Sequence, residues 1–269
     1  MRVLVGILLF STIVSIGVGQ EVTSASDPEI RIHSLKIEAD SLPSVDRERM
    51  SRLFKDRTYL QGEVEERIVI AFQNLGYFRA RGDEPKLSFV GETQGAKDVN
   101  VAIRVDEGVQ YRLGAIRFEK ASLFPPDRMR KLFPIQTGDL FNRTKIVEGL
   151  EQLRSLYATE GYVDFVANPV TRFDELHRTI ALVIEIDEGN PYGFGRLVLD
   201  GVEPHAGAGK ALLESWKTLQ GRRYSPPLLK RWLAANTSEW PSRGAVTSDR
   251  IVSAQDLALR VVNVKLLLP

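Results

Sequence analysis

The sequence contains no cysteine and only three histidines in 269 residues. The lack of cysteine excludes a disulfide framework, a catalytic thiolate, a cysteine-ligated metal and a lipid anchor on an N-terminal cysteine. An excess of one charge sign is missing too, because 36 Lys and Arg face 35 Asp and Glu. Since nucleic-acid binding needs a concentrated positive field, no nucleic-acid partner is expected. Apolar residues make up 43% of the chain, which is enough for packed globular cores.

Recognisable motifs for chemistry are also missing. The histidines His33, His177 and His205 lie far apart, without the spacing of metal ligands. The segment Gly207–Lys210 lacks the outer glycine and the Ser or Thr of a phosphate loop. No Gly-x-Ser-x-Gly elbow occurs. We therefore predict no catalytic residues, no metal and no cofactor. An exported enzyme is the alternative. It would need a group of catalytic residues, and none of the motifs considered above occurs in the sequence.

The longest apolar run begins at the N-terminus. Arg2 precedes it, and the small residues Gly17 and Gly19 end it, which is typical of a secretory signal peptide cleaved after residue 19. The alternative is an uncleaved anchor, because the run approaches the roughly 20 residues that span a bilayer. Residues 20–29 are mostly polar or small. We predict a signal peptide over residues 1–19 and a leader over residues 20–29.

An internal repeat is the most informative feature. Residues 105–118 (VDEGVQYRLGAIRF) match residues 186–199 (IDEGNPYGFGRLVL), and an Asp, a Glu, two Gly and a Tyr are identical. A Gly-Tyr pair precedes each copy, at Gly76 and at Gly161. A period of about 80 residues divides the chain into three repeats. Their predicted ranges are 30–110, 111–190 and 191–269, the third being degenerate.

Each repeat is predicted to run strand, helix, helix, strand, strand. In the second repeat Asn142 is a plausible N-cap of the longer helix, Gly161 ends that helix, and apolar alternation marks the last strand. The expected elements there are a strand at 113–118, a helix at 127–133, the longer helix from 142, and strands at 163–173 and 179–186. The matching elements elsewhere are 30–37, 46–54 and 63–75 in the first repeat, and 210–219, 228–236 and 257–268 in the third.

Such a β-α-α-β-β repeat has one natural topology. Its last two strands form a hairpin, and its first strand lies parallel to the third after the helical crossover. The expected fold class is α+β, with a three-stranded mixed sheet of order 1-3-2 and two helices on one face. The second strand is then an exposed edge that can pair with another strand.

These motifs together resemble POTRA domains, the polypeptide-transport-associated domains of outer-membrane assembly (Omp85-type) proteins. The resemblance rests on the Gly-Tyr helix stop, the turn Gly138-Asp-Leu-Phe141, and the repeated Asp-Glu-Gly linker. It implies a periplasmic module near the outer membrane that binds unfolded outer-membrane proteins or assembly-complex subunits by strand addition. In most relatives a membrane β-barrel follows the array, and too few residues follow here for one. We therefore expect a non-enzymatic scaffold without its own barrel.

An alternative within the same resemblance is an inner-membrane-anchored interaction protein of a division or transport complex. It requires residues 3–19 to stay attached to the mature chain, so the mass of the exported protein separates the two hypotheses.

Two groups of functional residues are predicted. The partner-binding edge strands are expected to contain Val163, Phe165, Val166, Val170, Leu87, Phe89 and Val90. The inter-domain linkers are expected to contain Gly108, Tyr111, Gly114, Gly189, Tyr192 and Gly195. The adjacent carboxylates of the linkers, Asp106-Glu107 and Asp187-Glu188, are interpreted as structural, because neighbouring side chains of an extended segment point apart.

A basic cluster marks the third repeat. It consists of Arg222, Arg223, Lys230 and Arg231, close to Trp232. A solvated helix face is one interpretation, and contact with the anionic headgroups of a membrane surface is the other.

Overall fold

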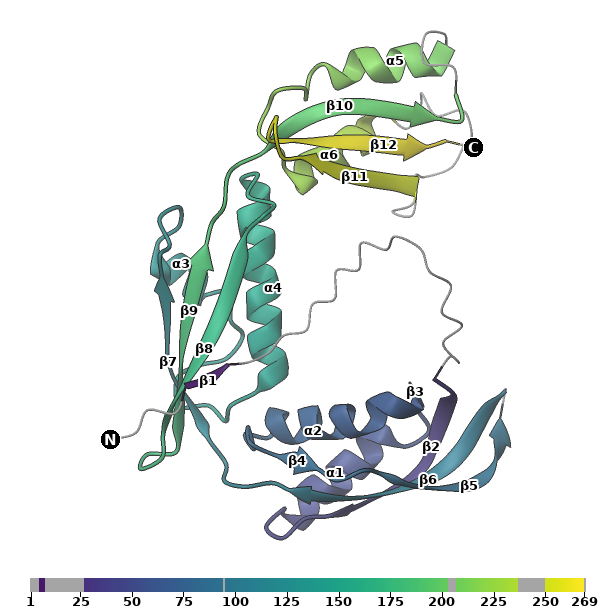
Figure 1. Ribbon diagram of the computed structural model, residues 1–269, viewed down its shortest axis with the longest axis vertical. Coiled ribbons are helices and arrows are strands. Elements are labelled where there is room, and N and C mark those ends of the chain that lie inside the picture. Colours follow the sequence, from purple (N-terminus) through teal and green to yellow (C-terminus); the bar gives the residue numbers. More distant parts are fainter. Residues whose placement is uncertain (1–4, 8–26, 94, 203–206, 237–249, 269) are drawn as a thin grey trace. The chain divides into compact units, whose positions relative to one another are not determined.

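The computed structural model describes residues 5–7, 27–93, 95–202, 207–236 and 250–268 (Figure 1). Most of the predicted signal peptide and leader lie outside these residues. Tertiary contacts group the chain into two compact units. The first contains residues 1–117, 133–148 and 169–183, and the second contains residues 118–132, 149–168 and 184–269.

The first sheet is built around the predicted strand–helix–helix–strand–strand order. Strand β2 (Glu29–Glu38) lies parallel to β6 (Ala96–Asp106), and β5 (Lys86–Thr93) lies antiparallel to β6 on its other side. Two short strands add to this core, β3 (Thr58–Leu60) beside β2 and β4 (Arg81–Gly82) beside the end of β6. These two short strands were not expected from the sequence.

Apolar residues alternate along the strands of this sheet, so one of its faces is apolar. Two helices cover that face. In β6 the side chains of Val99, Val101, Ile103 and Val105 are buried, and the residues between them are half-buried or exposed. They pack in one cluster with buried residues of α1 (Ser44–Phe54) and α2 (Val64–Asn74). The short 3-10 helix η1 (Gln61–Glu63) leads into α2.

The second repeat contains a sheet with the order β1-β8-β9-β7. Its own strands therefore lie in the expected order, first, third, second, and β1 (Val5–Ile7) is added outside β8. The other elements are β7 (Arg112–Glu119), α3 (Pro126–Arg130), α4 (Arg143–Thr159), β8 (Val166–Asp174) and β9 (Thr179–Asp187). Asn142 is the predicted N-cap, since its Oδ1 accepts a hydrogen bond from the Lys145 N–H at 2.9 Å.

The start of strand β8 in this repeat differs from the prediction. The strand expected at 163–173 begins only at Val166, because residues 161–164 belong to an irregular connection after α4. Phe165 is buried and its ring stacks on Tyr157 of α4, with 4.1 Å between the ring centroids. Core packing therefore decides the conformation of this segment.

The third repeat has the sheet order β10-β12-β11, again first, third, second. Strand β10 (Gly193–Asp200) is parallel to β12 (Val261–Leu267), and β11 (Ile251–Asp256) is antiparallel to β12. The helices are α5 (Gly207–Trp216) and α6 (Pro226–Ala235), whose Trp216 and Trp232 meet edge to face in the core. The closing strand predicted at 257–268 is wrong at its start, because residues 257–260 form the turn between β11 and β12.

None of the helices within the described residues is both long and apolar enough to cross a membrane.

Candidate functional site: sheet edges and domain junctions

Strand β8 forms the edge of the second sheet's own three strands, and another strand pairs with it. Strand β1 lies antiparallel to it, with Val5 opposite Arg172, Gly6 opposite Thr171 and Ile7 opposite Val170 (Figure 1). This pairing ends one residue after Pro169. Proline occurs in sheets where its missing N–H faces a free edge. The part of the edge that pairs with β1 therefore lies on the C-terminal side of Pro169.

The predicted edge residues of the second repeat do not all lie on this edge. Val166 and Val170 belong to β8, and Val166 is 53% exposed. Phe165 is in the core, and Val163 packs against the hydrophobic core of the third repeat. Val163 and Phe165 are therefore wrong as strand-addition residues, because both lie before the strand and their side chains are occupied by core packing.

The edge strand of the first repeat is β5, and it differs from β8 in shape. Phe89 is 66% exposed and Val90 is 48% exposed, whereas Leu87 packs against the core. The register shifts between Phe89 and Gly91, which places a bulge in the middle of the strand. A bulge twists an edge away from a regular partner strand. In the third repeat the corresponding edge strand is β11, for which the sequence analysis named no residue.

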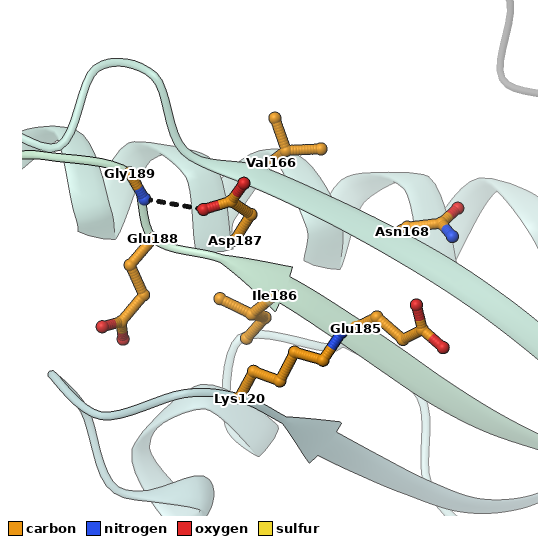
Figure 2. A pocket seen from close by; sticks show the side chains of 8 residues that line it. All are labelled: Lys120, Val166, Asn168, Glu185, Ile186, Asp187, Glu188 and Gly189. Atoms are coloured by element: carbon orange, nitrogen blue, oxygen red, sulfur yellow. Dashed lines mark hydrogen bonds between the residues drawn. The ribbon is translucent and has the colours of Figure 1, made fainter.

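An open hollow lies beside the N-terminal half of β8. Its volume is about 480 Å³. Figure 2 shows Val166 and Asn168 of β8 beside Glu185 and Ile186 of β9, with Lys120 on the other side. The remaining lining residues are Asp187, Glu188 and Gly189. The hollow is thus lined by charged side chains and by the linker turn.

The Asp-Glu-Gly linker is a turn closed by its aspartate. The Gly108 N–H donates to Asp106 Oδ1 at 3.3 Å, and the Gly189 N–H donates to Asp187 Oδ1 at 3.1 Å. Both glycines have positive φ, 64° and 66°, a conformation that favours glycine. These hydrogen bonds agree with the structural role that the sequence predicts for the two aspartates.

The glutamate of each linker has a role that the sequence analysis missed. Glu188 accepts hydrogen bonds from the Ser122 N–H at 2.8 Å, from the Leu123 N–H at 2.9 Å and from the Tyr157 hydroxyl at 2.9 Å. The Ser122 hydroxyl donates to it as well. Burial acts to raise the pKa of Glu188, but these hydrogen bonds outweigh it and lower the pKa to about 2.

Glu107 does the same in the first repeat. Its carboxylate is buried and accepts hydrogen bonds from the backbone N–H groups of Asp40 and Ser41. Burial acts against the charged form, but the hydrogen bonds from Ser41 and Asp40 lower the pKa of Glu107. In both repeats the carboxylate thus anchors the loop that follows the first strand. A Ser-Leu pair, at Ser41 and at Ser122, is the sequence feature that could have revealed this contact.

Each junction between repeats uses the same two backbone hydrogen bonds. Within the first compact unit the Tyr111 N–H donates to the Gly76 carbonyl at 2.8 Å, and the Phe141 N–H donates to the Tyr111 carbonyl at 3.0 Å. Within the second compact unit the Tyr192 N–H donates to the Gly161 carbonyl, and the Tyr224 N–H donates to the Tyr192 carbonyl, both at 2.8 Å. The Gly-Tyr helix stop of one repeat therefore docks on the first tyrosine of the next repeat.

The tyrosine side chains complete the junctions. Tyr111 is fully buried, and its hydroxyl donates to Glu175 at 2.7 Å. Arg79 forms an ion pair with Glu175 at 2.7 Å and lies over the Phe173 ring at 4.3 Å. Burial and the bond to Glu175 raise the pKa of Tyr111 to about 12, although the Arg79 charge acts in the opposite direction. At the other junction the Tyr192 hydroxyl donates to Asp164.

The two remaining linker glycines lie where a neighbouring strand approaches closely. A Cβ on Gly114 would lie 3.3 Å from the Ile180 carbonyl oxygen, and one on Gly195 would lie 2.9 Å from Val261 Cγ2. Gly195 also falls at the register shift between β10 and β12. These close contacts lie within single repeats, and the linker role of the two glycines stays a prediction.

The Tyr111 hydroxyl gives a first testable prediction. Because a hydrogen bond to a carboxylate contributes about 1.5–3 kcal/mol, Tyr111→Phe should lower the free energy of unfolding by that amount. Thermal unfolding of Tyr111→Phe, Glu175→Gln and the double variant measures the coupling. We expect the second substitution to cost little once the first is made. Additive losses would show that the two side chains act independently.

Comparison with known proteins identifies the family of the second repeat. Residues 111–189 match the POTRA family model, described as surface antigen variable number repeat. These residues form a POTRA domain. The α+β fold class predicted from the sequence is confirmed. Tyr111 is the first residue of this POTRA domain, and Tyr192 lies just past its end.

Longer similarities extend beyond this POTRA domain. The chain is 25% identical over 218 residues to the outer membrane protein assembly factor BamA of Buchnera aphidicola subsp. Acyrthosiphon pisum. That alignment covers 75% of this chain and 34% of BamA, so the chain spans about a third of the length of this curated relative. The crystal structure of POTRA domains 3–5 of Haemophilus influenzae BamA matches 91% of this chain and 99% of its own, with a TM-score of 0.61 and 18% identity. At 18% identity, the match to the crystal structure of POTRA domains 3–5 shows a similar fold and nothing more.

Proposed function

We propose that this chain is a periplasmic POTRA scaffold of outer-membrane protein assembly that binds extended polypeptides by strand addition to β8. Its partners would be unfolded outer-membrane proteins or subunits of the assembly complex, held without catalysis, metal or cofactor. The sequence similarity to an outer membrane protein assembly factor supports the proposed role in outer-membrane protein assembly. The pairing of β1 with β8 is the single observation that supports the binding mode. The three-domain division at residues 30–110, 111–190 and 191–269 is part of the same proposal.

The polarity and position of the bound strand follow from the β1 pairing. An incoming strand would run antiparallel to β8 and lie opposite Val170, Thr171 and Arg172. Pro169 removes a backbone donor from the middle of β8, so regular pairing is favoured on its C-terminal side. Val166 lies on the other side of Pro169, next to the hollow beside β8, and would contact side chains of the bound polypeptide rather than its backbone.

Strand β8 is a better acceptor than β5 for a backbone reason. The exposed side chains Phe89 and Val90 make β5 apolar, but its bulge interrupts the ladder that a partner would have to extend. We therefore assign β5 the weaker contribution to binding.

The N-terminal segment links this binding mode to export. We propose that residues 1–19 are a signal peptide, and that their removal in the periplasm leaves the edge of β8 free for a partner. The mass of the exported protein tests this step. A chain that retains residues 1–19 would keep β1 on the edge and contradict the proposal.

The binding mode is tested by removing one backbone donor. Residues two apart in a strand direct their N–H groups to the same side, so Thr171 shares the edge side with Pro169. Thr171→Pro should therefore reduce photocrosslinking of unfolded outer-membrane proteins to a photoreactive residue at Val170 by about fivefold or more, since each hydrogen bond contributes about 1 kcal/mol.

A matched control separates binding from folding. Thr171→Val keeps the N–H and nearly the same side-chain shape, so it should crosslink like the parent chain. Circular dichroism melting of both variants checks that the sheet is intact. Undiminished crosslinking in a folded Thr171→Pro variant would exclude strand addition at this edge.

A further inference from the structure

Two hairpin turns of the chain have the same backbone geometry. The turn between β8 and β9 begins after Asp174, and the turn between β11 and β12 begins after Asp256. Each aspartate accepts a hydrogen bond at 3.0 Å from the N–H three residues on. Each turn ends on an arginine with positive φ, 50° at Arg178 and 51° at Arg260. The side chains on these two turns can therefore be compared position by position.

The comparison shows an apolar tip on the third repeat. Leu257 and Leu259 occupy the positions of Glu175 and His177, and they are 70% and 72% exposed. The second-repeat turn also carries one exposed leucine, Leu176, at 86%. Exposed leucines at a turn are therefore common to both repeats, but only the third repeat places two of them at one tip.

The third repeat also carries more positive charge next to the tip than the second repeat does. The Arg260 carbonyl accepts a hydrogen bond from the Gly193 N–H at 2.9 Å, and Gly193 forms a β-bridge with Arg223. Arg222 is next to it, since its carbonyl accepts from the Phe194 N–H at 2.7 Å. In the second repeat Asp139 and Leu140 hold the positions of Arg222 and Arg223, as shown by the Arg112–Leu140 bridge.

These arginines keep their charge available. All three, Arg222, Arg223 and Arg260, are exposed, and none forms an ion pair with another described residue. Arg223 lies 5.9 Å from the Tyr162 ring, a contact that leaves its positive charge uncompensated. The nearby carboxylate Asp164 is engaged by the Tyr192 hydroxyl. The result is an apolar tip with three arginines around its base.

We propose that this tip, formed by Leu257, Leu259, Arg222, Arg223 and Arg260, binds an anionic phospholipid surface. The leucines enter the headgroup region, and the arginines bind lipid phosphates. A turn is a convex feature, which suits insertion into a fluid headgroup layer, and the same layer supplies the negative charge. An acidic polypeptide would satisfy the arginines but leave the protruding leucines in water.

Vesicle flotation of the full chain tests the proposal. Binding to vesicles of phosphatidylethanolamine and phosphatidylglycerol is compared with binding to vesicles of phosphatidylcholine alone. The difference between the two is the anion-dependent part of the binding. Arg222→Gln with Arg223→Gln should weaken that part about fivefold for each arginine and make it less sensitive to salt. Leu257→Ser with Leu259→Ser should weaken it roughly tenfold. Leu176→Ser, on the equivalent turn, should leave it unchanged.

Three outcomes would overturn the proposal. The parent chain could show no anion-dependent binding, or both double variants could bind like the parent while keeping its circular dichroism melting curve. Binding to polyglutamate without binding to anionic vesicles would assign the surface to an acidic polypeptide instead.

Discussion

Gly161→Ala is expected to lower the free energy of unfolding by about 2–5 kcal/mol. Gly161 has φ of 83°, a conformation that costs other residues about 1–2 kcal/mol. A Cβ there would also lie 2.7 Å from the Tyr192 carbonyl oxygen and 2.9 Å from Arg223 Cγ, and such overpacking costs about 1–3 kcal/mol. The junction must open to relieve this contact. Calorimetric unfolding measures the loss, and protease sensitivity of the third repeat reports the opening.

Gly221→Ala is the matched control for this prediction. Gly221 also has positive φ, 77°, but a Cβ there would meet no atom within 4 Å. Its substitution should cost only the backbone part, about 1–2 kcal/mol. Gly76→Ala should behave like Gly161→Ala, because its Cβ would lie 2.9 Å from the Tyr111 carbonyl oxygen. Equal losses at Gly161 and Gly221 would contradict the close approach of the two repeats.

Glu188→Gln is the second substitution with a large expected effect. One carboxylate oxygen accepts hydrogen bonds from the Ser122 N–H, the Leu123 N–H and the Tyr157 hydroxyl, and the neutral amide oxygen of glutamine would accept them more weakly than the charged carboxylate does. A pKa lowered from 4.5 to about 2 corresponds to at most about 3 kcal/mol of stabilisation at neutral pH, and solvent screening of this half-buried carboxylate reduces that value. We expect a loss of that order in the free energy of unfolding. Glu185→Gln, which removes a neighbouring carboxylate without these hydrogen bonds, should change little.

The pH dependence of this effect has a defined direction. Because the pKa of Glu188 is lower in the folded chain than in the unfolded chain, its stabilisation is complete above about pH 4.5 and is lost as pH falls toward 2. The difference in stability between the parent chain and Glu188→Gln should therefore shrink between pH 5 and pH 3, the range in which the ordinary glutamate pKa lies. A constant difference over this range would mean that the charge of Glu188 is not the source of its effect.

Much of the fold could be predicted because its determinants are local. The repeated Asp-Glu-Gly linker set the period, the polar side chain of Asn142 marked the start of α4, and alternation of apolar residues marked β9. The predicted strand boundaries were wrong where contacts between residues far apart in the sequence, or the geometry of a turn, determine the structure. Phe165 continues an apolar pattern but stacks on Tyr157, and Leu257 and Leu259 alternate like a strand although Asp256 and Arg260 close a turn around them.

The candidate site was predicted less completely for the same reason. The linker tyrosines were placed at the junctions from the motif alone, and the structure brings Tyr111 and Tyr192 to the two Gly-Tyr helix stops. The roles of Glu107 and Glu188 were not visible, because their hydrogen-bond partners Ser41 and Ser122 lie 66 residues away in the sequence. Contacts at that separation leave no mark in local periodicity.

Hydrogen–deuterium exchange of the β8 amides tests the central claim most directly. The exported chain is compared with and without an unfolded outer-membrane protein. Strand addition predicts slower exchange for the edge-facing backbone amides of Thr171 and Phe173, a smaller change from Val166 to Asn168, and little change in α4. Protection confined to the helices, or no change along β8, would contradict the account.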